Sequence, residues 1–169
     1  AVPLWSPQYQ TYVVVTIGLL SAMYDEKRIH KEAAPRMLVY AAWTESGQLA
    51  KWWGPNDFSA PVCEIDARPG GVLYIQMEPP EGGRNTVDGR VQEAVPNARL
   101  VFAANLRDPS DGLLAKTHTV VTFRDVEGGT EVSLTQTAVP YREFGPDFPE
   151  GMREGSRQTL ENLAAMSFA

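Results

Sequence analysis

A series of segments after Phe58 alternates apolar and polar residues with a period of two, and short turns separate these segments. This is the period of a β-strand, whose successive side chains point to opposite faces. One apolar face per segment favours an antiparallel sheet that is covered on one side only, and such short connections do not suit parallel strands. The residues predicted to face inward are Cys63, Ile65, Ala67, Leu73, Ile75, Met77, Val87, Val91, Leu100, Phe102, Ala104, Leu106, Val121, Phe123, Val132, Leu134 and Ala138.

Two short helices are predicted just before these strands. Pro35 to Trp43 has apolar residues at helical spacing, and proline is favourable in a first helical turn. Gly47 to Trp53 follows, and Gly54-Pro55 ends it. Thr44 or Ser46 is its predicted N-cap. Because tryptophan buries a very large apolar area, we expect the Trp side chains here to pin the helices against the sheet.

The last segment, Pro149 to Phe168, carries Met152, Leu160 and Leu163 at helical spacing. We expect it to form a long helix that covers the apolar face of the sheet. Glu26 to Glu32 is the predicted first strand. The predicted fold class is therefore α+β: a curved antiparallel sheet of six to seven strands wrapped around a long C-terminal helix, with two short helices after the first strand.

Composition narrows the function classes. A chain of 169 residues is long enough for one domain with a substantial core, and its net charge of −6 argues against a nucleic-acid partner. The single cysteine, Cys63, cannot form an internal disulfide and fits a reducing, cytoplasmic compartment. Because the only histidines are His30 and His118, we expect no Cys/His metal site, and nothing indicates a cofactor.

The beginning of the chain is apolar, and no charged residue precedes Asp25. The run from Tyr12 to Ala22 is too short for a membrane span, which needs about 20 residues. It also lacks the basic residues that precede a signal-peptide core. We therefore expect residues 1–24 to be an N-terminal extension and residues 25–169 to be the domain. The residues of this extension predicted to be buried, within the fold or against a second subunit, are Val13, Val15, Ile17 and Leu19.

Several motifs follow one another along the chain: Ala34-Pro35-x-x-x-Val39-x-x-Ala42-Trp43-Thr44, Leu49-x-x-Trp52-Trp53-Gly54-Pro55, Asp66-x-Arg68-x-Gly70-Gly71, Asp88-Gly89-x-Val91, Arg99-Leu100-Val101-Phe102 and a C-terminal helix opened by Gly151. Their order resembles that of the activator of heat-shock protein 90 ATPase homologue-like family, in the START-like (SRPBCC, helix-grip) superfamily. The resemblance implies a sheet that grips the C-terminal helix, with a hydrophobic cavity between them. Because the family is functionally mixed, the resemblance constrains chemistry only weakly.

Such a cavity would bind a small apolar or amphipathic molecule. Thr119 and Gln136, together with Thr117, lie on predicted inner faces and are candidates to orient a ligand, with water or backbone groups as their alternative partners. The predicted ligand-binding residues are Trp52, Trp53, Ile65, Ile75, Met77, Val91, Phe102, Thr119, Val121, Phe123, Leu134, Gln136, Met152 and Leu160.

The sequence contains no recognisable catalytic constellation. Cys63 faces inward without a base placed to activate its thiol. His118 falls on the polar face of its strand, where an exposed histidine is expected. The pairs Asp66/Arg68 and Asp88/Arg90 also fall on the solvent face, where surface ion pairs contribute little.

Three functions stay open at this point. The leading one is binding of a small apolar molecule between the sheet and the C-terminal helix. The second is a cyclase-, aromatase- or hydrolase-like enzyme on an apolar substrate, which needs a polar dyad inside the cavity. The third is a co-chaperone-like module that stimulates a chaperone ATPase. A homodimer, formed through sheet edges or the apolar leader, is also open.

Overall fold

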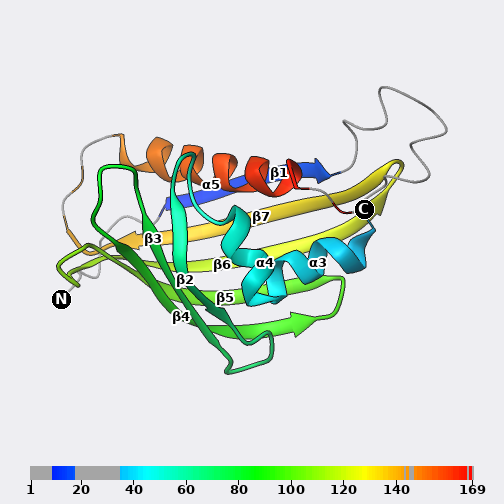
Figure 1. Cartoon of the computed structure of the whole chain (residues 1–169), viewed down its shortest axis with the longest axis horizontal. Helices are drawn as coiled ribbons and strands as arrows, with labels where there is room; N and C mark the ends of the chain where they lie inside the picture. The colour runs from blue at the N-terminus through cyan, green and yellow to red at the C-terminus, as the bar shows by residue number, and fades with distance from the viewer. Residues whose placement is uncertain (1–8, 18–34, 143, 145–146, 167, 169) are drawn as a thin grey trace.

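The computed structural model describes residues 9–17, 35–142, 144, 147–166 and 168, and for residues 9–17 it describes the backbone. The elements in chain order are β1 (Tyr9–Ile17), α3 (Arg36–Thr44), α4 (Ser46–Trp52), β2 (Ser59–Ile65), β3 (Val72–Glu78), β4 (Asn85–Val95), β5 (Arg99–Arg107), β6 (Leu113–Val126), β7 (Gly129–Pro140) and α5 (Phe148–Ala164). Figure 1 shows a curved sheet with the three helices packed against one side of it.

The strands form one seven-stranded sheet in the order β1-β7-β6-β5-β4-β3-β2. All neighbouring strands are antiparallel. From β2 to β7 each strand pairs with the next one along the chain, because the short turns leave no length for a crossover. Every segment with period-two alternation is a strand. The predicted antiparallel sheet of six to seven strands is therefore confirmed.

The predicted apolar face of the sheet forms the core. Its most deeply buried apolar residues, each at most 1% exposed, are Leu73, Ile75, Val91, Leu100, Val121, Val132 and Ala138. From the other side, α5 contributes Leu160 and Leu163 and α3 contributes Val39, all completely buried in the same cluster. The C-terminal helix thus lies on the apolar face, and the helix-grip α+β fold is confirmed.

The first described strand, β1, lies in the segment that was predicted to be an extension. Glu26 to Glu32 lies outside the described residues, and the first described strand is β1, which pairs with β7 from Tyr9↔Ala138 to Ile17↔Thr130. Its run of valines and threonines is β-branched, which favours strands. Part of the predicted extension 1–24 therefore forms an edge of the sheet beside α5 (Figure 1). The division at residue 24 stays a prediction, and a chain that began at Met23 would lack this strand.

Two tryptophans join α3, α4 and the sheet. The Trp43 ring, 1% exposed, has its centroid 4.7 Å from that of Trp52 and 6.3 Å from that of Phe123 in β6. Trp52 Nε1 donates a hydrogen bond to the carbonyl oxygen of Ala42 at 3.0 Å. Ala42 lies in the last turn of α3, where carbonyl groups have no intrahelical donor. The indole of Trp52 therefore supplies a hydrogen-bond donor to a carbonyl group at the end of α3, and it also packs in the core.

The predicted N-cap of α4 is wrong. Glu45 occupies that position and makes no capping hydrogen bond through its side chain. Thr44 Oγ1 donates instead to the carbonyl of Tyr40, at 3.0 Å. Ser46 Oγ accepts a hydrogen bond from the amide of Ile65 at 3.0 Å, so it fastens α4 to the end of β2. Both hydroxyl groups find backbone partners other than the start of α4, a competition typical of serine and threonine.

Trp52→Phe is expected to lower the free energy of unfolding by about 1 to 2 kcal/mol more than Trp43→Phe. Both changes remove the same volume, but only the first leaves the Ala42 carbonyl without its donor. Trp43 Nε1 has no hydrogen-bond partner among the described residues. Urea unfolding of the two variants measures the difference. Equal losses of stability would show that the Trp52–Ala42 bond contributes nothing measurable.

Candidate functional site

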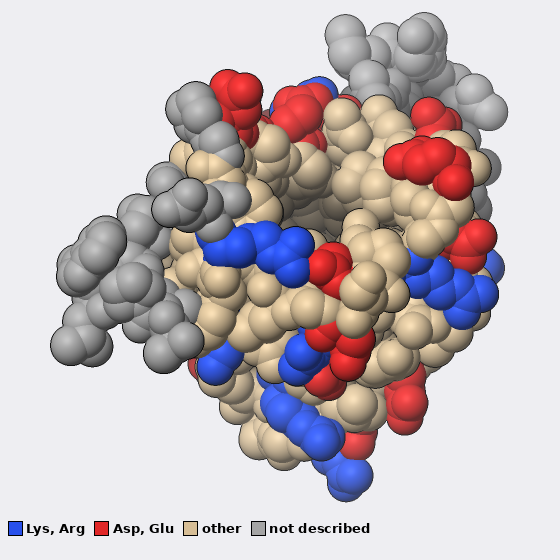
Figure 2. All heavy atoms as spheres, turned by 90° about the vertical axis from the view of Figure 1, so that its left-hand side faces the viewer, with Lys and Arg blue, Asp and Glu red and all other residues tan. Residues whose placement is uncertain are grey.

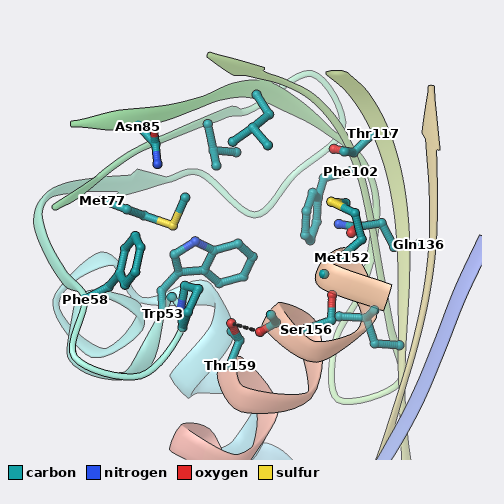
Figure 3. Close-up of a pocket in the computed structure, with 17 residues that line it drawn as sticks. Trp53, Phe58, Met77, Asn85, Phe102, Thr117, Gln136, Met152, Ser156 and Thr159 are labelled. Carbon is teal, nitrogen blue, oxygen red and sulfur yellow. Dashed lines mark hydrogen bonds between the residues drawn. The ribbon is translucent and has the colours of Figure 1, made fainter. Parts of the chain in front are cut away.

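A cavity of about 260 Å³ lies between the inner face of the sheet, the loop after α4 and the first half of α5. Figure 3 shows its lining, and Figure 2 shows a hollow at the end of the molecule where α5 begins, with uncharged residues inside it and charged side chains around it. The lining residues are Trp53, Gly54, Pro55, Phe58, Met77, Asn85, Val87, Phe102, Leu106, Thr117, Leu134, Gln136, Gly151, Met152, Gly155, Ser156 and Thr159.

Aromatic and sulfur-containing side chains form most of the apolar wall. Trp53 follows the end of α4, and its ring centroid is 6.4 Å from that of Phe102 on β5. Trp53 is itself packed against Trp43, with centroids 6.0 Å apart, so the core supports this wall from behind. Phe58 and Met77 face the Trp53 ring from the side of β2 and β3 (Figure 3). Such flat, polarisable surfaces suit an apolar ligand.

Apart from Met152, the helical wall is made of small residues. Gly151, Gly155 and Thr159 recur at a spacing of four, and therefore lie on one face of α5. A Cβ atom at Gly155 would lie 3.9 Å from Pro55 Cγ, an ordinary contact distance. Large side chains on this face would fill the space, so its small residues leave the cavity open.

Hydrogen bonds hold the loop after α4 against α5. Asn162 Nδ2 donates to the carbonyl of Gly54 at 2.9 Å. The amide of Asn56 donates to Gln158 Oε1 at 3.0 Å. These bonds connect residues about a hundred positions apart in sequence. They fix the distance between the loop wall and the helical wall of the cavity.

The cavity also contains a few polar groups. Gln136 Nε2 donates to Thr119 Oγ1 at 3.0 Å, and Thr119 is completely buried beneath it. Thr117 Oγ1 lies 3.4 Å from the carbonyl oxygen of Ala104. Thr159 Oγ1 donates to the carbonyl of Gly155, at 2.8 Å. Among the described residues, no hydrogen bond engages the side chain of Asn85.

None of the described residues that line the cavity has an ionisable side chain. A buried charge without a partner is very costly in an apolar environment. A carboxylate or ammonium group of a ligand would find no opposite charge on these walls. The arrangement therefore suits an uncharged molecule.

The predicted ligand-binding residues divide into two groups. Those that line the cavity are Trp53, Met77, Phe102, Leu134, Gln136 and Met152. Those that lie in the packed interior beside it are Trp52, Ile65, Ile75, Val91, Thr119, Val121, Phe123 and Leu160. The strand residues of the second group have the predicted inward direction, but they belong to one packed core cluster with Trp43, Leu160 and Leu163.

Sequence reasoning missed several lining residues. Phe58 lies in the loop before β2, and Asn85 and Val87 lie at the start of β4. The spacing of Gly151 and Gly155 on the C-terminal helix was a signal that could have indicated the cavity, since glycine is unfavourable inside a helix. The loop residues gave no comparable signal, because no periodicity fixes where a loop side chain points.

The titratable candidates lie away from the cavity lining. Cys63 is half-buried, and desolvation raises the pKa of its thiol to about 11, so the thiol is protonated at neutral pH. His118 is exposed and its Nε2 lies 3.1 Å from Gln92 Oε1. Arg68 Nε lies 2.6 Å from Asp66 Oδ2 in an exposed ion pair. The predicted exposure of His118 and of the Asp66/Arg68 pair is confirmed.

Comparison with known proteins gives the same architecture. A crystal structure of a Chromobacterium violaceum protein superposes with a TM-score of 0.74 at 25% identity, covering 95% of this chain and 99% of that one. A putative uncharacterized protein from Rhizobium leguminosarum gives a TM-score of 0.74 at 20% identity, covering 94% and 93%. The AHSA1 protein from Silicibacter pomeroyi gives a TM-score of 0.69 at 21% identity, covering 92% and 95%.

Two further findings concern the chain as a whole. No described helix has both the length and the apolar character that a membrane crossing requires. No curated protein matches the chain in sequence.

The family described as activator of Hsp90 ATPase homolog 1-like protein matches residues 33–167. This range begins just before α3 and extends past the end of α5, so it contains both walls of the cavity. The sheet that grips a C-terminal helix is the architecture of the START-like superfamily. The chain belongs to the activator of Hsp90 ATPase homolog 1-like family.

Proposed function

We propose that this protein binds a small apolar or amphipathic molecule between its sheet and α5. The observation that carries the proposal is the cavity itself, an apolar space of about 260 Å³ with a few polar groups on its walls. Concave, mostly apolar pockets with a small number of polar groups are typical ligand sites. The predicted residues Trp53, Met77, Phe102, Leu134, Gln136 and Met152 form part of this proposed site.

The volume of the cavity limits the size of the ligand. A cavity of roughly 150 Å³ holds one benzene molecule, so this one suits a compound of roughly ten non-hydrogen atoms. A ligand of that size binds with a dissociation constant of about 1 to 100 µM when its contacts are good. A whole phospholipid is far larger than this space. A single small ring system fits the proposal better.

Native mass spectrometry of freshly purified protein, followed by a thermal-shift screen of small uncharged aromatic compounds, tests the proposal. A ligand at 100 times its dissociation constant adds about 2.7 kcal/mol, which raises Tm by about 5 to 10 °C. The same mass spectrum reports the subunit number, and so tests whether the protein forms the homodimer that the sequence leaves open. A protein that carries no bound molecule and whose Tm no compound raises would contradict the proposal.

An enzymatic role has less support from the site. Acid–base catalysis needs a proton donor or acceptor within reach of the substrate. The described lining residues offer hydroxyl and amide groups but no carboxylate, imidazole or thiol. A cyclase-like reaction in this cavity would therefore depend on shaping the substrate.

A second candidate function is binding to a chaperone, and the description of the matched family favours it. A pull-down with purified chaperone and an assay of its ATPase rate test this candidate. A rise in the ATPase rate that depends on this protein would support it. An unchanged rate with no complex formed would remove it.

A further inference from the structure

Polar side chains on the inner face of the sheet gather on β6 and β7, apart from Asn85 on β4 and Thr130 at the start of β7. Antiparallel register sets Thr119 of β6 opposite Gln136 of β7 and, on its other side, opposite Phe102 of β5. Thr117 of β6 lies two residues away on the same face. The neighbouring inward positions Val121 and Leu134 are apolar and buried. Thr117, Thr119 and Gln136 therefore form a local polar cluster, and Thr117 and Gln136 line the cavity.

The two polar atoms of the Gln136 side chain differ: Nε2 has a hydrogen-bond partner among the described residues, and Oε1 has none. Its Nε2 atom donates to Thr119 Oγ1, and Thr119 is completely buried, so the amide is anchored from below. The side chain lines the cavity, and no described residue provides a hydrogen bond to its Oε1 atom. A polar pair that merely satisfied itself would add little stability over two apolar side chains of the same shape. A polar group of a bound ligand could supply the missing hydrogen bond to the Gln136 amide.

The chemistry of an amide defines the partner. A carboxamide offers either an acceptor oxygen or a donor NH₂, and the Thr119 hydroxyl can satisfy either end. A ligand hydroxyl can donate to the oxygen or accept from the nitrogen, so it matches both orientations. A carboxylate does not, because none of the described lining residues compensates its charge.

The position of Gln136 also fits a flat ligand. Figure 3 shows its side chain beside Phe102 and Met152, across the cavity from Phe58 and Met77. Trp53 lies between these two sides, with its ring centroid 6.4 Å from that of Phe102. A ring system in this space would lie against apolar side chains, with one edge toward the amide.

We propose that the ligand is an uncharged aromatic molecule of roughly ten non-hydrogen atoms that bears a hydroxyl group, and that Gln136 selects for the hydroxyl. This inference rests on the proposed function and adds to it the chemical class of the ligand. Gln136 is then a specificity residue of the site, and Thr119 is the residue that positions it.

Calorimetric titration at pH 7 with naphthalene, 2-naphthol and 2-naphthoate tests the inference. These probes share one ring system and differ in a single substituent: none, a neutral hydroxyl or a carboxylate. One hydrogen bond to the amide is expected to make 2-naphthol bind about tenfold tighter than naphthalene. The carboxylate is expected to bind at least about 100-fold weaker than 2-naphthol.

Gln136→Leu is expected to abolish the roughly tenfold preference for 2-naphthol, so that 2-naphthol and naphthalene bind with about the same affinity. Naphthalene binding itself should change by less than about threefold, because the leucine keeps the wall apolar. Gln136→Met serves as a second variant of similar volume, and it should lose the preference in the same way. Thr135→Val is the matched control: it changes the neighbouring residue of β7, on the opposite face, and should keep the wild-type preference.

The outcomes separate the two proposals. If the wild-type protein binds none of the three probes, the proposed function itself fails for compounds of this size. If naphthalene binds but 2-naphthol gains nothing, or the gain survives in Gln136→Leu and Gln136→Met, the role of Gln136 is wrong while the cavity still binds ligands. Tightest binding of 2-naphthoate would overturn the claim that the ligand is uncharged.

Discussion

Gly71→Ala is expected to lower the free energy of unfolding by about 3 to 5 kcal/mol. A Cβ atom at this position would lie 1.9 Å from the carbonyl oxygen of Asp66 and 2.9 Å from that of Arg68. Both atoms belong to the backbone, so neither can rotate away as a flexible side chain would. The turn between β2 and β3 must therefore open to accept even a methyl group.

Two backbone hydrogen bonds of Gly71 hold this turn in place. The Gly71 amide donates to the Arg68 carbonyl at 2.8 Å, and the Val91 amide donates to the Gly71 carbonyl at 2.8 Å. The second bond joins the β2–β3 turn to β4. A shift that relieves the clash at Gly71 therefore strains bonds to a neighbouring strand as well, which is why the expected loss is large.

Gly70→Ala is the matched control for Gly71→Ala. Gly70 has φ of +82°, and a Cβ atom there meets nothing within 4 Å. Its expected loss is only about 1 to 2 kcal/mol, the strain of a left-handed conformation. Chemical unfolding of both variants measures the difference. A loss at Gly71 no larger than that at Gly70 would show that the backbone moves easily here.

The sequence predicted the sheet well because the signal for it is local. Alternation assigns each strand residue to a face without reference to any other strand. Thus Ile75 and Val121 were predicted to face inward, and both are completely buried. The Pro69-Gly70-Gly71 turn follows from composition in the same way. Strand β1 was not predicted, because its valine-rich run has no alternation and resembles a hydrophobic leader.

The sequence could not predict which of the inward-facing residues line the cavity. Alternation says which way a side chain points but not what lies above it. Val91 and Leu134 both point inward, yet only Leu134 lines the cavity. That difference depends on the volumes of side chains from α4 and α5, elements far apart in sequence. Part of the cavity wall comes from loop residues such as Phe58, for which no periodic signal exists.

Gly155→Phe is expected to weaken binding of an aromatic probe such as 2-naphthol by at least about 100-fold. Gly155 lines the cavity on the helical side, next to Pro55. A cavity of roughly 150 Å³ holds one benzene molecule, so a phenyl ring would take up much of the 260 Å³ available. The ring would bury itself among Trp53 and Phe102 and would leave no room for a second ring system.

Gly155→Ala separates this blocking effect from the effect of the helix. A Cβ atom at this position makes only an ordinary contact at 3.9 Å, and alanine is favoured over glycine inside a helix by about 1 kcal/mol. We therefore expect Gly155→Ala to unfold at a higher temperature and to bind the probe within about threefold of wild type. Calorimetric titration and thermal unfolding of both variants measure these effects. If Gly155→Phe folds and still binds 2-naphthol with wild-type affinity, the probe occupies some other part of the protein, because the space beside α5 is then filled by the protein's own side chain.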